Sequence, residues 1–128
     1  MSDPPSGHAT GEEGEALAAA YLEAKGFRVL ETNYRFSREE IDLVCFRPEG
    51  QGGELVFVEV KTRRGHGFGR PEEAVGPAKR KAILRTAEAY LHEHRLEGAS
   101  CRFDVVAITL GRGEPQIEHF EHAFGYFF

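Results

Sequence analysis

The stretches Glu40-Ile41-Asp42-Leu43-Val44 and Phe57-Val58-Glu59-Val60-Lys61 decide the fold of this chain. Both combine branched or aromatic residues, which favour strands, with charged residues at alternate positions. Alternate side chains of a strand project from the same face of a sheet. A strand that begins Leu55-Val56-Phe57-Val58 has no packing reason to continue with a carboxylate and an ammonium group. The pattern therefore indicates a functional site built on a hydrophobic sheet.

The flanking sequence predicts the other elements of a single domain. Helices are expected at 10–25 and 77–97, and strands at 27–33, 40–46, 54–62, 101–110 and, as a shorter fifth, 116–120. Thr10 and Glu13 fit a capping box at the start of the first helix, and Gly26 fits the glycine that ends it. The order α-β-β-β-α-β predicts an α/β fold with a mixed central β-sheet flanked by helices. Residues 1–9 are expected to be disordered, residues 10–120 to form the domain, and residues 121–128 to form an aromatic tail.

Composition places the chain among ordinary globular proteins. It has 128 residues, of which 41% are hydrophobic and 29% charged. No apolar run approaches the roughly 20 residues of a membrane span, and the polar N-terminus lacks a signal-peptide core. We therefore expect a cytoplasmic protein with no membrane partner. Cys45 and Cys101 form no C-x-x-C motif and are expected to be free thiols.

Positive charge is concentrated after the second stretch. The whole chain carries −5, yet the segment from Lys61 to Arg85 contains eight Lys or Arg against two acids and carries +6. Taken alone, such a segment is usually a solvated loop and helix start. Next to paired carboxylates it instead suggests a rim that contacts a nucleic-acid backbone. The residues expected to bind nucleic acid are Arg63, Arg64, Arg70, Lys79 and Arg80.

The carboxylates point to a metal site. If the second and third strands pair as a hairpin, Asp42 lies close to Glu59 and Lys61. Two carboxylates at close range repel each other, and a hard cation such as Mg²⁺ relieves that repulsion. Glu40 faces the same way as Asp42 and is an accessory candidate, while Glu15 lies at the edge of the buried face of the first helix. A salt bridge where the strands reach solvent is the alternative for Asp42, Glu59 and Lys61.

The chain resembles the YraN family of small bacterial proteins, which belong to the restriction-endonuclease-like group with the PD-(D/E)XK signature and are related to archaeal Holliday junction resolvases. The resemblance spans about residues 11–110. It is carried by Gly11, Glu15, Ala18, Tyr21-Leu22, Gly26-Phe27, Asn33-Tyr34-Arg35, Glu40-Ile41-Asp42-Leu43-Val44, Phe57-Val58-Glu59-Val60-Lys61-Thr62-Arg63, Gly69-Arg70-Pro71, Ala74-Val75, Lys79, Ala87, Tyr90-Leu91 and Arg102-Phe103-Asp104-Val105-Val106.

This resemblance implies a metal-dependent endonuclease that acts on DNA, including branched repair or recombination intermediates. By the same resemblance, Asp42, Glu59 and Glu15 would hold Mg²⁺ or Mn²⁺, and Lys61 would be the catalytic lysine. One departure is Glu39, where the family usually has Gly before the Glu-Ile-Asp motif. A nucleic-acid-binding protein of the same fold without turnover is the alternative.

Two groups of residues near the C-terminus, a pair of histidines and a cluster of aromatic residues, are not assigned to the site. His119 and His122 are expected in an exposed tail rather than in a site. The aromatic cluster Phe120, Phe124, Tyr126, Phe127 and Phe128 either docks on its own sheet or forms a homodimer contact.

Overall fold

The computed structural model describes residues 7–65 and 76–124, and these form a five-stranded sheet with two helices. The elements are α1 (Gly7–Ala24), β1 (Arg28–Phe36), β2 (Glu39–Glu49), β3 (Gly52–Arg64), α2 (Pro77–Glu93), β4 (Cys101–Leu110) and β5 (Gln116–Phe124). The strands lie in sequence order, and only β3 and β4 are parallel. A parallel pair needs a crossover connection, which α2 supplies. The predicted α/β class with a mixed sheet between helices is confirmed.

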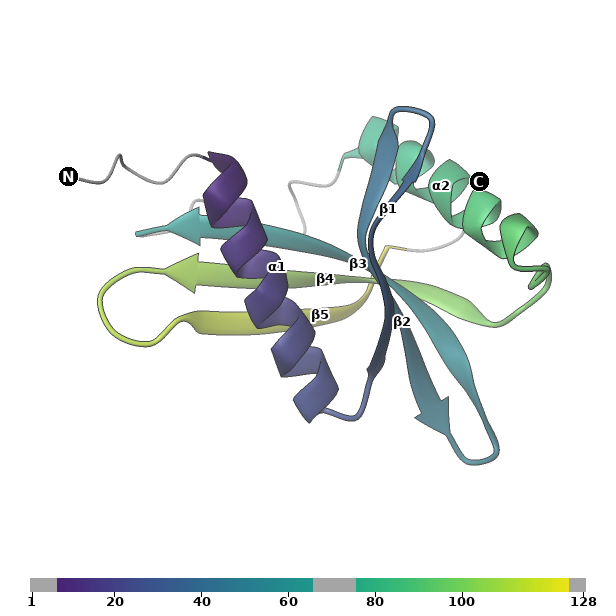
Figure 1. Cartoon of the computed structure of the whole chain (residues 1–128), viewed down its shortest axis with the longest axis horizontal. Helices are drawn as coiled ribbons and strands as arrows, with labels where there is room; N and C mark the ends of the chain where they lie inside the picture. Colours follow the sequence, from purple (N-terminus) through teal and green to yellow (C-terminus); the bar gives the residue numbers. More distant parts are fainter. Residues whose placement is uncertain (1–6, 66–75, 125–128) are drawn as a thin grey trace.

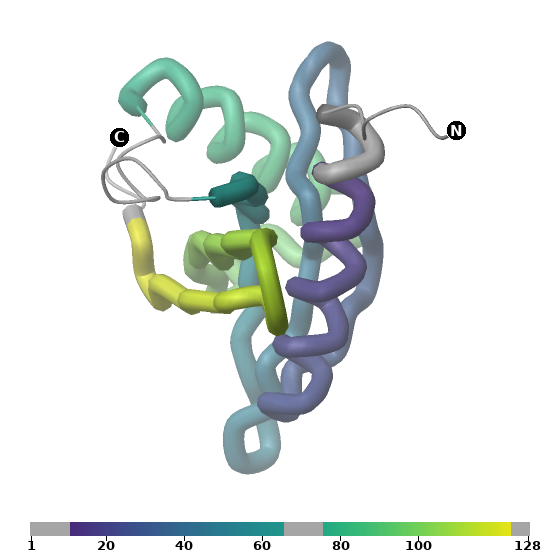
Figure 2. Tube along the Cα trace, turned by 90° about the vertical axis from the view of Figure 1, so that its left-hand side faces the viewer, coloured from purple at the N-terminus to yellow at the C-terminus, as the bar shows by residue number. Residues whose placement is uncertain are grey.

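The sheet separates two hydrophobic cores, and each helix closes one of them. Ala18 and Leu22 of α1 pack on one face of the sheet, and Ile83, Ala87 and Tyr90 of α2 pack on the other. Figure 1 shows α1 crossing in front of the strands, and Figure 2 shows the two helices on opposite sides of the sheet. The sheet is thus covered on both faces, as its parallel pair requires.

Strand β3 divides its side chains between these two cores, as the alternation predicted. Leu55 and Phe57 belong to the core beneath α2, while Val56 and Val58 belong to the core beneath α1. Glu59 continues the strand immediately after this apolar run and is only 4% exposed. The regular pleat therefore carries a carboxylate into the interior of the molecule.

The ends of α1 differ from the prediction in one respect and agree in another. The helix begins at Gly7, so Thr10 lies inside it, and the prediction that Thr10 is the N-cap was wrong. Gly26 has φ 96° and terminates the helix as predicted, because the N–H groups of Gly26 and Phe27 donate to the carbonyls of Glu23 and Leu22. Residues 1–6 of the expected disordered segment lie outside the described residues.

The last strand is longer than the sequence suggested. β5 continues to Phe124 and pairs with β4, so residues 121–124 of the predicted tail belong to the sheet. Residues 125–128 lie outside the described residues. Across 7–65 and 76–124, neither helix has the length and apolar character to cross a membrane. Cys45 and Cys101 are both free thiols, as expected.

Candidate functional site

Asp42 lies where the backbone pairing between β2 and β3 stops. The register ends at Leu43 opposite Val58, and the next residues along the two strands are Asp42 and Glu59. The Oδ2 atom of Asp42 accepts a hydrogen bond of 2.7 Å from the backbone N–H of Val60. A side-chain oxygen thus satisfies a donor that a strand carbonyl would otherwise satisfy. Beyond this point β3 continues beside β4 alone, and the strands open around the carboxylates.

Three carboxylates from two elements meet at this opening. One oxygen each from Glu15 of α1 and Glu40 and Asp42 of β2 lie within 4.8 Å of one another. The side-chain amide of Asn33 donates to Glu15 at 2.9 Å and to Glu40 at 3.5 Å. The structure therefore brings Glu15 to Asp42, as predicted, and gives Glu40 a more central position than the sequence indicated.

A glycine allows α1 to come close enough for this contact. Gly14 lies so near Thr62 of β3 that a Cβ atom at position 14 would overlap the threonine side chain. The hydroxyl Oγ1 of Thr62 is buried and has no hydrogen-bond partner among the described residues. Because Glu15 is the next residue, the close approach of α1 to β3 at Gly14 determines how far its carboxylate reaches over the sheet.

Glu59 is the most buried acid near the site, but it is not one of the three clustered carboxylates. Its Oε2 atom lies 3.6 Å from the ammonium of Lys79 in the first turn of α2. Its Oε1 atom is buried without a hydrogen-bond partner in the described part of the chain. Burial raises the pKa of Glu59, and the positive charges of Lys79 and Lys61 oppose that rise. One oxygen is therefore available to a cation, and the other is already paired.

Asp42 interacts electrostatically both with Glu59 and with the other two clustered carboxylates, Glu15 and Glu40. Burial, followed by the negative charge of Glu59, raises the pKa of Asp42 to about 7. The charges of Glu15 and Glu40 act in the same direction, and the N–H of Val60 opposes them. Three neighbouring carboxylates thus act on Asp42, and their negative charge favours either a proton on Asp42 or a bound cation.

Lys61 lies one pleat beyond Glu59 on β3 and is half-buried. Its ammonium group is close enough to lower the pKa of Glu59. The charge at position 61 therefore acts on the buried acid, as both the catalytic and the salt-bridge interpretations require. Lys61 is also placed beside the opening between β2 and β3.

The residues predicted to bind nucleic acid are only partly brought together. Arg64, at the end of β3, forms an ion pair of 3.2 Å with Glu13. Arg63 and Arg80 are half-buried, and Lys79 directs its ammonium to Glu59. Arg70 lies outside the described residues. The positive segment therefore contributes at least one cation to the site itself.

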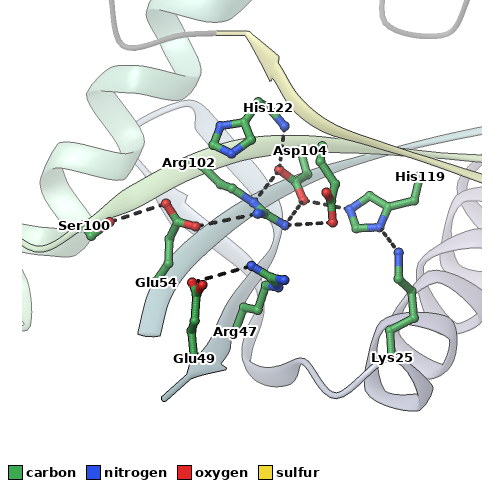
Figure 3. Close-up of polar contacts among 10 residues, drawn as sticks. Lys25, Arg47, Glu49, Glu54, Ser100, Arg102, Asp104, His119 and His122 are labelled. Atoms are coloured by element: carbon green, nitrogen blue, oxygen red, sulfur yellow. Dashed lines mark hydrogen bonds and ion pairs between the residues drawn. The ribbon is translucent and has the colours of Figure 1, made fainter. Parts of the chain in front are cut away.

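Sequence reasoning missed a second polar network, which lies on β4 and β5, where Asp104 is in register with Val58 of β3. Asp104 is fully buried on β4 and accepts hydrogen bonds from His119 at 2.7 Å and from the backbone N–H of His122 at 3.1 Å (Figure 3). Arg102 lies 3.0 Å from Asp104, and its guanidinium also reaches Glu121 at 3.2 Å. The expectation that His119 lies in an exposed tail was wrong, because its side chain is 2% exposed within β5.

This second network is closed by its own cation. The Nζ atom of Lys25 lies 2.8 Å from Nδ1 of His119. An ammonium can only donate, so Nδ1 accepts and Nε2 carries the proton that bonds Asp104. An oxygen and nitrogen set from Asp104, His119 and Glu121 is also compact enough for a metal. Arg102 already supplies positive charge there, so we interpret the network as a structural link between β4, β5 and the turn that follows α1. The alternation of Arg102 and Asp104 was its one visible sequence signal.

An α/β domain with carboxylates gathered at a split between two strands is the class that this fold and site define. A model of the Uncharacterised protein family UPF0102 matches residues 14–108. The chain is 49% identical to a UPF0102 protein of Anaeromyxobacter dehalogenans (strain 2CP-C), an alignment that covers 91% of this chain and 84% of that one. It is 45% identical to UPF0102 protein DehaBAV1_0707 of Dehalococcoides mccartyi, with 91% and 93% covered. A relative from Moorella thermoacetica is 50% identical, with 81% and 83% covered.

The chain belongs to the UPF0102 family, which is the YraN family that its motifs predicted. The matched residues include Glu15, Asp42, Glu59 and Lys61, and therefore span the candidate site.

Proposed function

We propose that this protein is a divalent-metal-dependent endonuclease that acts on DNA. The observation that carries the proposal is the approach of Glu15, Glu40 and Asp42 to within 4.8 Å beside a buried Glu59 with an unpartnered oxygen. Carboxylates at such distances repel one another, and a bound cation relieves that repulsion. The sequence pattern Asp42, Glu59-Val60-Lys61 agrees with the PD-(D/E)XK signature that the chain resembles.

The donor set fits Mg²⁺ or Mn²⁺. All the available atoms are carboxylate oxygens, which hard divalent cations prefer. Asp42, Glu15 and Glu40 would hold the ion, with the free oxygen of Glu59 as a further ligand. A cation bound there would lower the pKa of a coordinated water and stabilise negative charge on a phosphodiester.

The other side chains have roles that follow from their placement. Lys61, at the opening of the strands, would hold a phosphate oxygen or orient the attacking water, because an ammonium offers three donors. Asn33 bonds both Glu15 and Glu40 and so orients two carboxylates at once. Lys79 balances part of the charge of Glu59 and opposes the rise in its pKa that burial causes.

A nucleic-acid-binding protein without turnover is the second candidate. The specific observation in its favour is the Lys79–Glu59 ion pair at 3.6 Å, since a chain that supplies its own cation has less need of a metal. Such a protein would bind DNA through surface cations, and its affinity would fall steeply with salt.

The deciding experiment measures cation binding before it measures cleavage. Calorimetry with MgCl₂ and MnCl₂ should detect binding to the wild type and not to Asp42→Ala. Linear, flapped and four-way DNA should then be cleaved with Mg²⁺ and be left intact with chelator. Absence of heat and of cleavage, together with DNA binding that is independent of metal, would establish the second candidate instead.

A further inference from the structure

A cavity lies between α2 and the hairpin of β1 and β2. It has a volume of about 750 Å³, and its wall includes Tyr34, Arg35, Phe36, Arg85 and Glu93. In Figure 1 the tip of this hairpin lies beside α2. Pockets that hold small organic ligands have volumes of roughly 300–1,000 Å³, so a nucleotide would fit.

The wall combines the aromatic ring of Phe36 and the guanidinium groups of Arg35 and Arg85 with the carboxylates of Glu88 and Glu93. Phe36 is one of the exposed large hydrophobic residues within 7–65 and 76–124, with 48% of its area exposed. Such a ring can stack on a base of any sequence. Arg35 and Arg85 are 77% and 61% exposed, and guanidinium groups bind phosphate oxygens with two parallel hydrogen bonds.

Arg35 connects the cavity to the carboxylate cluster, because it lines the cavity and pairs with one member of the cluster. Arg35 forms an ion pair of 3.1 Å with Glu40, which is one of the three clustered carboxylates. Arg85 of α2 lies 3.6 Å from Glu39, the residue before Glu40. A strand whose phosphate lies at the cluster would therefore have an adjacent nucleotide at the mouth of the cavity.

We propose that this cavity receives one unpaired nucleotide of the DNA strand held at the carboxylate cluster, with its base stacked on Phe36 and its phosphate held by Arg35 and Arg85. The inference rests on the proposed function and names its substrate class, which is DNA with a single-stranded or flapped segment. A base inside a duplex has both faces covered by its neighbours, so it reaches Phe36 only after it unstacks and unpairs.

The test uses the absence of tryptophan from this chain, because Phe36→Trp then introduces the only tryptophan, whose emission can be excited separately from that of the four tyrosines. Leu30→Trp is the matched control, since Leu30 lies on the same strand, is also 48% exposed and does not line the cavity. Both variants are titrated with a single-stranded oligonucleotide, a flapped duplex and a blunt duplex. EDTA or Ca²⁺ replaces Mg²⁺ so that the DNA stays intact, and anisotropy of labelled DNA measures total binding.

The emission of Phe36→Trp should be quenched by the single-stranded and flapped DNA and far less by the blunt duplex, while Leu30→Trp stays unchanged. In the anisotropy assay Phe36→Ala should weaken single-strand binding about 5- to 150-fold, which corresponds to the loss of one stacked base. Phe36→Tyr should restore it, and Leu30→Ala should have no effect. Arg35→Gln should reduce the slope of log affinity against log salt by about one.

The outcomes separate this inference from the proposed function. Metal-dependent cleavage with no change in emission at position 36, or equal affinities of Phe36→Ala and Leu30→Ala, would overturn the nucleotide cavity and leave the endonuclease. Quenching without cleavage under any metal would support the cavity and overturn the endonuclease. Failure of every DNA to bind would overturn both.

Discussion

The Asp42 carboxylate accepts the backbone N–H of Val60 at 2.7 Å, at the point where β2 stops pairing with β3. This bond fixes Asp42, whose pKa is raised, between β2 and β3. It also gives Asp42 two functions, since one oxygen supports the strand and the side chain also lies against Glu15 and Glu40. The consequences of this arrangement for pH and for cation binding can be measured.

The stability of the metal-free protein should fall as the pH rises between about 4 and 7. Asp42 has a pKa of about 7 in the folded state against an ordinary value of 3.8, so over this range the folded state holds a proton that the unfolded state has lost. The loss should reach a few kcal/mol, because one pKa unit corresponds to about 1.4 kcal/mol. Urea unfolding at several pH values measures it. Asp42→Asn should flatten the curve over this range, and an unchanged slope in that variant would contradict the assignment.

Affinity for Mg²⁺ should rise with pH up to about 7 and then level off. A proton on Asp42 competes with the cation, and its raised pKa places that competition near neutrality. Calorimetry in buffers of different ionisation enthalpy should show release of protons on binding below that pH. Binding that is independent of pH across this range would mean that Asp42 is not a ligand.

Lys61→Ala should abolish cleavage and leave cation binding in place, because the substitution removes no ligand. Stability should change by about 0–1 kcal/mol, as for other partly exposed charges that act on a neighbouring acid. Lys61→Arg keeps the charge but cannot readily lose a proton, and we expect it to be inactive as well. Lys81→Ala, on the exposed side of α2, is the control and should behave as wild type. Undiminished cleavage by Lys61→Ala would remove Lys61 from the mechanism.

Gly14→Ala should weaken cation binding and destabilise the protein by about 1–3 kcal/mol, because its Cβ overlaps Thr62 and forces α1 away from β3. Gly11→Ala is a matched control in the same helix, with nothing within 4 Å of the added Cβ. It should stabilise the protein by about 0.5–1 kcal/mol through the higher helix propensity of alanine. Equal behaviour of the two variants in thermal unfolding and calorimetry would show that the close approach at Gly14 does not position Glu15.

Asp104→Ala should destabilise the protein by about 3–5 kcal/mol, since it leaves the buried guanidinium of Arg102 without its nearest partner. Cation binding by the folded fraction should be unchanged, because Asp104 is not one of the clustered carboxylates Glu15, Glu40 and Asp42. Denaturant unfolding measures the first effect and calorimetry the second. Glu118→Ala, an exposed position on β5, is the control and should cost little. A loss of cation binding in Asp104→Ala with intact fold would mean that the two networks are coupled.

The sequence alone predicted the class of fold and singled out Asp42, Glu59 and Lys61, which lie where β2 and β3 separate. Period-two alternation in 55–58 predicted which residues enter each core, and Gly26 predicted the end of α1, because both depend on local geometry. Asp42, Glu59 and Lys61 are charged residues in strands whose other residues are hydrophobic. This departure from the hydrophobic pattern identified them as candidates. The start of α1 at Gly7 was not visible, because the capping signal at Thr10 competes with residues that can also continue a helix.

Only the tertiary structure decided which acids meet. Glu15 and Glu40 are brought together by the approach of α1 at Gly14 and by the amide of Asn33, which lies on a third element. Lys79 pairs with Glu59 because α2 crosses over the sheet, a proximity that no spacing in the sequence encodes. His119 is buried against Asp104 because β5 adds to the edge of β4. Side-chain partners across elements depend on how two surfaces pack, and that packing is a property of the whole fold rather than of any one segment.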